Sequence, residues 1–234
     1  MEELLTELVE RLKQTYGDTL VSVVLYGSAA ASDHHKKHSD LNVICTLQQV
    51  GMDELRKGQK TIEWWTKQKQ PAPLLLSVEE LRGYDEVFPI EYLDIQQSHR
   101  VLYGEDPIAT IQVDRTNHRR QLEHELSSNL LRLRQRYLVL HPKEKDVIRL
   151  MIDSIASFAT AARHALLIAG VDAPSRKKEI FDAAAARFGL DAAPFHTVLK
   201  IREGIEKLAS QQVHALFARY VEQIAKLEEV LDNV

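Results

Sequence analysis

The stretch that decides the fold runs over residues 25–42 and reads LYGSAAASDHHKKHSDLN. It joins two apolar runs, residues 20–26 and 41–47, which are short and rich in residue types that favour buried strands. A Gly-Ser pair closes the first run, and Ser-Asp-Leu-Asn opens the second. The sequence therefore predicts two strands, with small and polar residues where the first ends and the second begins.

The Gly27-Ser28 pair has the properties of a phosphate-binding turn. Gly27 has no Cβ, so a phosphate can approach its backbone closely, and Ser28 adds a hydroxyl. The small residues 29–31 that follow are suited to a short helix, whose free N–H groups favour an anion. We expect Gly27 and Ser28 to bind the phosphates of a nucleotide.

Asp40 and Asn42 stand two residues apart at the start of the second run. Side chains two apart on a strand share a face, so both are expected to point at the same ligand while Leu41 packs behind them. A carboxylate beside a phosphate-binding turn suits Mg²⁺, which is usually shared with nucleotide phosphates. The pattern predicts Asp40 and Asn42 as ligands of a nucleotide-bound Mg²⁺.

Gly-Ser on one strand and Ser-Asp-Leu-Asn at the next resembles the Gly-Ser…Asp-x-Asp signature of the DNA polymerase beta-like nucleotidyltransferase superfamily. Within it, the likeness is to small bacterial nucleotidyltransferases of the aminoglycoside adenylyltransferase kind. The resemblance is at motif level over residues 20–47, extends to about residue 107 and is architectural beyond that. It implies Mg²⁺-dependent transfer of a nucleotide, AMP from ATP, to a hydroxyl of a small molecule or a protein.

The resemblance also implies a third carboxylate on a later strand. The segment FPIEYLDIQQSHRVLYGEDP, residues 88–107, follows in the expected place, and residues 88–95 are expected to form a strand. Glu91 has the apolar surroundings of that family's base and is expected to hold metal or to take the acceptor proton. Asp94 would lie on the opposite face of the strand, so only one of the two can join Asp40, and we favour Glu91.

Asn42 departs from the resemblance, which implies Asp at this position. An amide oxygen can bind a hard cation but brings no charge, so the fixed charge falls from three carboxylates to two. Preorganised charge often contributes several kcal/mol to lowering a barrier. Two functions therefore stay open: an enzyme with a degenerate metal motif, and a nucleotide-binding or protein-partner module that keeps the fold without transfer.

Beyond residue 114 the sequence changes character. Apolar residues recur at helical spacing over residues 122–140, 147–162 and 213–227, with shorter helical patterns at 180–188 and 195–201. We expect an α+β nucleotidyltransferase-like domain over residues 1–114, with a small mixed sheet and helices, followed by an all-α bundle over residues 115–234. The long apolar stripes also suggest a homodimer.

Composition limits the partners. The 234 residues carry a net charge of −4, so no strong basic field attracts nucleic acid, and nucleic acid is an unlikely partner. No apolar run approaches the roughly 20 residues that a membrane helix needs. The single cysteine, Cys45, cannot form an internal disulfide, and we expect a cytoplasmic protein. The expected partners are a nucleoside triphosphate and the acceptor.

Three histidines, His34, His35 and His38, share the polar loop between the two motifs with Lys36 and Lys37. A metal site needs fixed geometry that a polar loop rarely supplies. We favour a lid whose lysines lie near the triphosphate.

Overall fold

The chain divides into two compact units, Met1–Asp114 and Arg115–Val234. The structure is a computed structural model, and it describes residues 1–30, 40–109 and 112–231. The first unit combines a four-stranded sheet with helices, and the described part of the second unit is helical. This confirms the predicted fold class. The loop histidines and lysines fall within residues 31–39, outside the described residues.

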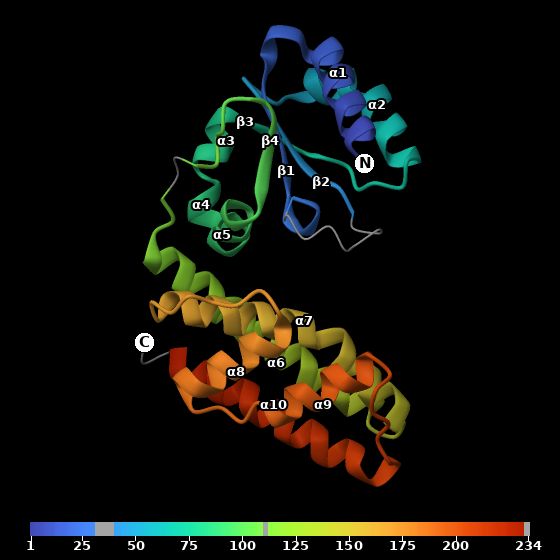
Figure 1. Cartoon of the computed structure of the whole chain (residues 1–234), viewed down its shortest axis with the longest axis vertical. Helices are drawn as coiled ribbons and strands as arrows, with labels where there is room; N and C mark the ends of the chain where they lie inside the picture. The colour runs from blue at the N-terminus through green and yellow to red at the C-terminus, as the bar shows by residue number, and fades with distance from the viewer. Residues whose placement is uncertain (31–39, 110–111, 232–234) are drawn as a thin grey trace. The chain divides into compact units, whose positions relative to one another are not determined.

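The sheet of the first unit has the strand order β3-β2-β1-β4. The central strand β1 (Leu20–Tyr26) pairs antiparallel with β2 (Asn42–Leu47) on one side and with β4 (His99–Gly104) on the other. The edge strand β3 (Leu74–Ser77) runs parallel to β2. Figure 1 shows the strands side by side with helices on both faces. The sequence patterns at residues 20–26 and 41–47 thus become the two middle strands.

One face of the sheet packs against helices α1 (Glu2–Tyr16) and α2 (Met52–Lys67), as Figure 1 shows. Alternate residues of β1 and β2 point into this core, because strand side chains alternate between faces. Gly17 ends α1 with a left-handed φ of 55°. The core contains Leu5, Leu8, Val9, Leu12, Tyr16, Leu20, Val23, Leu25, Leu41, Val43, Cys45, Leu47 and Trp65.

The other face packs against the short helices α3 (Val78–Arg82) and α4 (Tyr84–Val87) and the longer α5 (Pro89–Gln97). Its core contains Val24, Ile44, Leu81, Tyr92, Ile95 and Ile108. Asn42 is two residues before Ile44, so it belongs to this face and not to the face of α1 and α2.

Helix α5 corrects the predicted strand over residues 88–95. Pro89 occupies the first turn, where a missing N–H costs nothing, and Glu91 is an acidic residue in that same turn. Pro89, Ile90, Tyr92 and Ile95 are buried. A helix with apolar residues on several sides has no clear stripe, so its apolar run was indistinguishable from a strand.

The second unit contains five helices among its described residues: α6 (Arg115–Leu140), α7 (Glu144–Ile168), α8 (Lys177–Phe188), α9 (Ala193–Arg202) and α10 (Ser210–Leu231). Aromatic rings fill much of its core. Phe181 stacks on Phe195 with ring centroids 4.1 Å apart, and Phe158 and Phe195 both pack edge-on against Tyr220.

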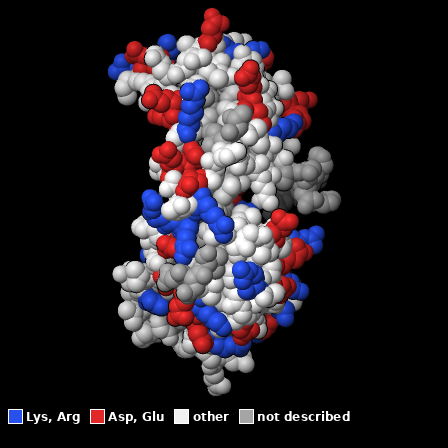
Figure 2. All heavy atoms as spheres, turned by 90° about the vertical axis from the view of Figure 1, so that its left-hand side faces the viewer, with Lys and Arg blue, Asp and Glu red and all other residues white. Residues whose placement is uncertain are grey.

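Acidic and basic side chains are interspersed over the face of the molecule that Figure 2 shows. Elsewhere on the first unit, charges pair along helices, as in the Arg11–Glu7 pair of α1 and the Lys67–Glu63 pair of α2, which each span one helical turn. Within the described ranges, no helix combines the length and the apolar character that crossing a membrane requires.

Candidate functional site

Gly27 ends β1 in the left-handed region, with a φ of 78°. The chain then makes a single 3₁₀ turn over Gly27–Ala29, closed by the Ala30 N–H donating to the Gly27 carbonyl. The short helix that we expected over residues 29–31 is therefore replaced by this turn up to Ala30, and Ala31 lies outside the described residues. One turn has little macrodipole, so any phosphate binding here depends on individual donors.

Asn42 lies directly against Gly27. The two neighbouring strands place Tyr26 opposite Asn42 in the register, and a Cβ added to Gly27 would stand 3.5 Å from Asn42 Nδ2. The Gly27-Ser28 pair and the segment from Asp40 to Asn42 thus meet where β1 ends and β2 begins. We call this end of the two middle strands the Gly27–Asn42 edge. Asn42 is half-buried, and its amide has no hydrogen-bond partner among the residues that the structure describes.

Asp40 is exposed and precedes β2, which begins at Asn42 rather than at Leu41 as expected. Leu41 between them is buried in the α1–α2 core, and its N–H donates to Gln70 Oε1 at 2.8 Å. Because extended residues alternate in direction, anchoring Leu41 turns Asp40 and Asn42 away from that core. Gln70 fixes this residue from a loop that the sequence did not single out.

Ser28 carries the hydrogen-bond donors of the turn that no described residue uses. Its side chain is exposed, and among the described residues neither its hydroxyl nor its N–H has a partner. The Gly27 N–H is already used, since it donates to the Ser98 carbonyl at 2.9 Å. A phosphate at this turn would therefore meet Ser28 and the open side of Gly27.

Glu91 lies exposed in the first turn of α5. Burial raises the pKa of Tyr84, and the Glu91 carboxylate raises it further. Burial likewise raises the pKa of Tyr26, with Tyr84 as the second cause. Tyr26 and Tyr84 both pack against the core on the sheet face that carries Asn42, and Glu91 lies on the helix that covers this face.

Asp94 stands three residues after Glu91 on the same helix. Positions three apart on a helix are neighbours, so the opposite-face argument that separated Glu91 from Asp94 was wrong. The choice between these two carboxylates is open on this geometry.

The four described strands contain no Asp or Glu. From Ile44 onward β2 also pairs with β3, whose sequence is LLLS. The described strands therefore do not supply the expected third carboxylate, which would have to come from outside them, as Glu91 on α5 does. Nor do three or more His, Cys, Asp or Glu side chains gather into a metal-binding group within the described ranges.

Mg²⁺ nevertheless fits the residues at this edge. Mg²⁺ is commonly bound through one or two carboxylates together with substrate phosphates and waters. Asp40 offers one exposed carboxylate, and Asn42 offers an amide oxygen that no described residue uses. The donor set is therefore adequate for a cation that arrives with a triphosphate, and weak for a cation alone.

A cavity of about 710 Å³ lies elsewhere in the first unit, where β2 and β3 end. Its lining includes Gln48, Leu76, Glu79, Tyr84 and Phe88. Gly27, Ser28 and Asn42 do not line it. Tyr84 and Leu76 line this cavity and also pack against the core cluster that Tyr26 contacts.

Cys45 is not a candidate nucleophile. It lies fully buried in β2, and burial raises the pKa of its thiol to about 12. The reactive thiolate is therefore not formed near neutral pH.

Comparison with solved structures finds spectinomycin adenyltransferase AAD(9) from Enterococcus faecialis, solved with ATP and spectinomycin. The match covers 95% of this chain and 99% of that chain, with a TM-score of 0.53 and 12% sequence identity. This chain has an aminoglycoside adenylyltransferase-like fold. The finding confirms the resemblance that residues 25–42 indicate, and at this identity it establishes the fold alone. No protein-family model and no curated protein matches the sequence.

Proposed function

We propose that the chain binds ATP with Mg²⁺ at the Gly27–Asn42 edge and transfers AMP to a hydroxyl group. The observation that carries the proposal is the contact between Gly27 and Asn42, which joins two motifs that the sequence separates. The donors of Ser28 and the amide of Asn42, without partners among the described residues, support it. The adenylyltransferase-like fold supports it further.

Each residue has a stated part in the proposal. Ser28 donates its hydroxyl and N–H to phosphate oxygens, and the missing side chain of Gly27 leaves room for them. Asp40 and Asn42 provide oxygen ligands for Mg²⁺, which neutralises phosphate charge during the displacement. The acceptor oxygen bonds to the α-phosphorus as the bond to pyrophosphate breaks. Glu91 takes the acceptor proton.

The protein side chains at this site carry less negative charge than the family pattern implies. With Asn42 in place of Asp and no acidic residue on the described strands, the triphosphate itself must supply much of the negative charge around Mg²⁺. Charge placed in advance is worth several kcal/mol in a barrier. We therefore propose slow transfer that needs a high Mg²⁺ concentration.

The acceptor class to test first is a hydroxyl-bearing small molecule, because the similar adenyltransferase was solved with spectinomycin. A protein hydroxyl is the second class. Because ATP is the donor, we place the reaction in the cytoplasm.

The test is transfer from ATP labelled at the α-phosphate to a panel of amino-sugar acceptors, with Mg²⁺ varied. Asp40→Ala should abolish transfer while the protein stays folded. Asn42→Asp should raise transfer at limiting Mg²⁺ about tenfold or more, because it restores a charged ligand. Full activity in Asp40→Ala would refute the site.

Nucleotide binding without transfer is the second candidate, and the strands without carboxylates favour it. The same experiment separates the two. Transfer that occurs only in Asn42→Asp would identify the natural chain as a binding module. Transfer by the wild type would exclude this second candidate.

A further inference from the structure

Ser98 contacts the Gly27 peptide groups on both sides. The Gly27 N–H donates to the Ser98 carbonyl, and the Ser98 hydroxyl donates to the Gly27 carbonyl, each at 2.9 Å. Ser98 lies between α5 and β4, 71 residues further along the chain. The turn that ends β1 is thus held by a residue to which no sequence motif points.

The hydroxyl of Ser98, together with the Ala30 N–H, holds the Gly27 carbonyl and so sets the direction of the Ser28 N–H. The carbonyl of Gly27 and the N–H of Ser28 belong to one peptide group, which is planar and trans, so they point in opposite directions. Gly27 adopts its φ of 78° without steric strain, but a glycine also rotates more freely than other residues, so its orientation depends on its hydrogen bonds. Fixing the Gly27 carbonyl therefore aims the Ser28 N–H.

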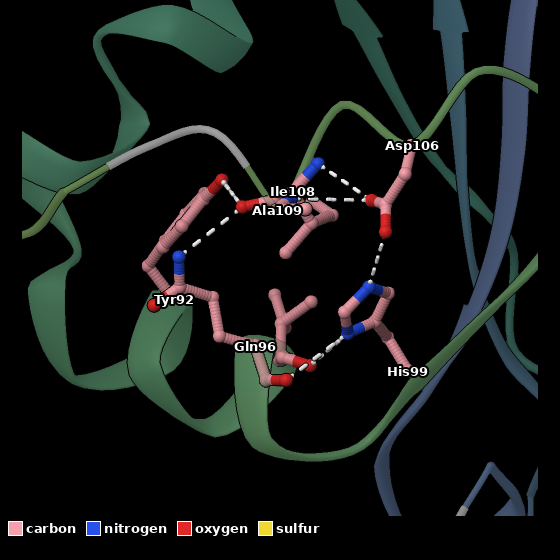
Figure 3. Close-up of polar contacts among 7 residues, drawn as sticks. Tyr92, Gln96, His99, Asp106, Ile108 and Ala109 are labelled. Carbon is pink, nitrogen blue, oxygen red and sulfur yellow. Dashed lines mark hydrogen bonds and ion pairs between the residues drawn. The ribbon is translucent and has the colours of Figure 1, made fainter.

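His99, the next residue after Ser98, is held on both sides of its ring, as Figure 3 shows. His99 Nδ1 lies 3.1 Å from the carbonyls of both Ile95 and Gln96, at the end of α5. His99 Nε2 lies 3.0 Å from Asp106 Oδ2. The His99 ring therefore joins the end of α5 to β4 and to the turn that contains Asp106.

The Asp106 carboxylate is also held by backbone N–H groups. Its other oxygen, Oδ1, accepts hydrogen bonds from the N–H groups of Ile108 and Ala109. Partial burial disfavours the charged carboxylate, but the hydrogen bonds from His99 and from these N–H groups outweigh it and lower the pKa of Asp106. The carboxylate is therefore ionised and cannot rotate without losing several bonds.

The network closes back onto α5. The Tyr92 hydroxyl and Gln96 Nε2 both donate to the Ile108 carbonyl, at 3.0 and 3.1 Å. Figure 3 shows these side chains converging on Ile108 from the helix. These hydrogen bonds hold the segment that contains Ser98, so the Ser98 hydroxyl has a fixed position from which it donates to the Gly27 carbonyl.

We propose that Ser98 is a positioning residue of the nucleotide site, whose hydroxyl orients the Gly27–Ser28 peptide so that the Ser28 N–H meets a phosphate oxygen. The inference rests on the proposed function. Ser98→Ala isolates the hydroxyl, because the backbone bond between Ser98 and Gly27 remains.

The test is calorimetric titration of the full chain with a non-hydrolysable ATP analogue and Mg²⁺. Ser98→Ala should weaken binding about three- to tenfold, as expected for one hydrogen bond. Ser98→Thr keeps a hydroxyl at this position, and its affinity should stay within about twofold of the wild type. A purely structural role would not respond to the hydroxyl in this way.

Ser77→Ala is the matched control. Ser77 is the N-cap of α3, and its hydroxyl accepts a hydrogen bond from the Glu80 N–H rather than donating one to Gly27. It should lower the thermal midpoint of the first unit and leave affinity unchanged. Wild-type binding with equal affinity in Ser98→Ala overturns this inference alone. Absence of binding by the folded wild type overturns the proposed function and the inference together.

Discussion

Two groups of polar side chains, one in each unit of the chain, differ in how they are paired. In the helical unit, polar groups in and around the core bond to one another: His118 to His164 at 2.8 Å, and Ser154 to Tyr220 at 3.1 Å. In the first unit, Ser28 and Asn42 gather at one edge of the sheet without partners among the described residues. A polar group that folding leaves unpaired is available to a ligand, whereas a paired one stabilises the fold.

The same contrast appears in their glycines. Gly27 has a left-handed φ and lies against Asn42, so the requirement for glycine comes with a neighbouring functional group. Gly189 also has a left-handed φ, but it ends α8 and a Cβ there would meet nothing within 4 Å. Gly189 serves a helix end, whereas Gly27 belongs to the proposed site.

The comparison can be measured one unit at a time. Both tryptophans, Trp64 and Trp65, lie on α2 of the first unit, so tryptophan fluorescence follows that unit. Far-UV ellipticity is most sensitive to helices, so it follows mainly the long helices of the second unit.

The largest effect is expected at Gly104. A Cβ there would stand 2.0 Å from the Val21 carbonyl oxygen, and its φ is 77°. Gly104→Ala should lower the free energy of unfolding of the first unit by at least about 3 kcal/mol, from combined clash and strain. The measurement is urea unfolding followed by tryptophan fluorescence.

Gly189→Ala is the matched variant in the second unit. An alanine at this position adds backbone strain but no steric clash. It should lower the free energy of unfolding of the second unit by about 1 kcal/mol. Equal losses at Gly104 and Gly189 would show that the close approach of Gly104 to Val21 is not real.

The next effect is a pH dependence confined to the helical unit. Burial, and then the neighbouring His164, lower the pKa of His118 to about 4. Between pH 6.5 and 4 the unfolded chain binds a proton that the folded unit does not, so stability falls as pH falls. From pH 7 to 5 we expect a loss of about 2 kcal/mol.

This loss should appear in denaturation followed by ellipticity. His118→Gln should flatten it, because the titrating group is gone. The idea fails if the wild-type helical transition is as stable at pH 5 as at pH 7, or if the variant keeps the full slope.

A smaller stability effect with a large binding effect is expected at Gly27. Gly27→Ala adds strain of about 1 kcal/mol, but its methyl group would occupy the space beside Asn42. Affinity for an ATP analogue should fall about tenfold or more, because the backbone is no longer open to a phosphate.

Gly17→Ala separates the two effects. Gly17 also has a left-handed φ in the first unit, but nothing lies within 4 Å of its Cβ position. Gly17→Ala should lose at least as much stability and keep its affinity, because the ψ of Gly17 is -131° and few residues other than glycine adopt this conformation. A comparable loss of binding in both variants would attribute the Gly27 effect to general destabilisation.

The smallest effect is expected at Arg100. Its guanidinium makes two hydrogen bonds to Glu2, joining β4 to α1, but both side chains are largely exposed. Arg100→Ala should cost the first unit about 0.5 kcal/mol, and less at high salt. Fluorescence-detected unfolding at two salt concentrations measures this, and a loss several times larger that salt does not reduce would contradict the surface character of the pair.

Local patterns were sufficient to predict most of the fold. The apolar runs at residues 20–26 and 41–47 become β1 and β2, and the stripe over residues 122–140 becomes part of α6. These elements are long or regular enough for one period to dominate. The helix at Pro89–Gln97 was missed because its apolar residues surround it and no period stands out.

The candidate site was predictable only in part. Gly27, Ser28, Asp40 and Asn42 stand out because two motifs have a characteristic spacing, and their roles stay predictions. Ser98, Gln70 and the His99–Asp106 pair were missed, because they reach the site through long-range contacts that no local pattern encodes. Such contacts are defined by the pairing of β1 with β4 and by the loop after α2.

The central claim is that the edge formed by Gly27, Ser28 and Asn42 holds a nucleotide with Mg²⁺. The most direct test is calorimetric titration of the full chain with a non-hydrolysable ATP analogue, with and without Mg²⁺, for wild type, Asn42→Ala and Asn129→Ala. Asn129 is a half-buried asparagine of the helical unit and serves as the control. We predict Mg²⁺-dependent binding in the wild type and in Asn129→Ala, and its loss in Asn42→Ala. Binding that ignores Mg²⁺, or that Asn42→Ala retains in full, would contradict the claim.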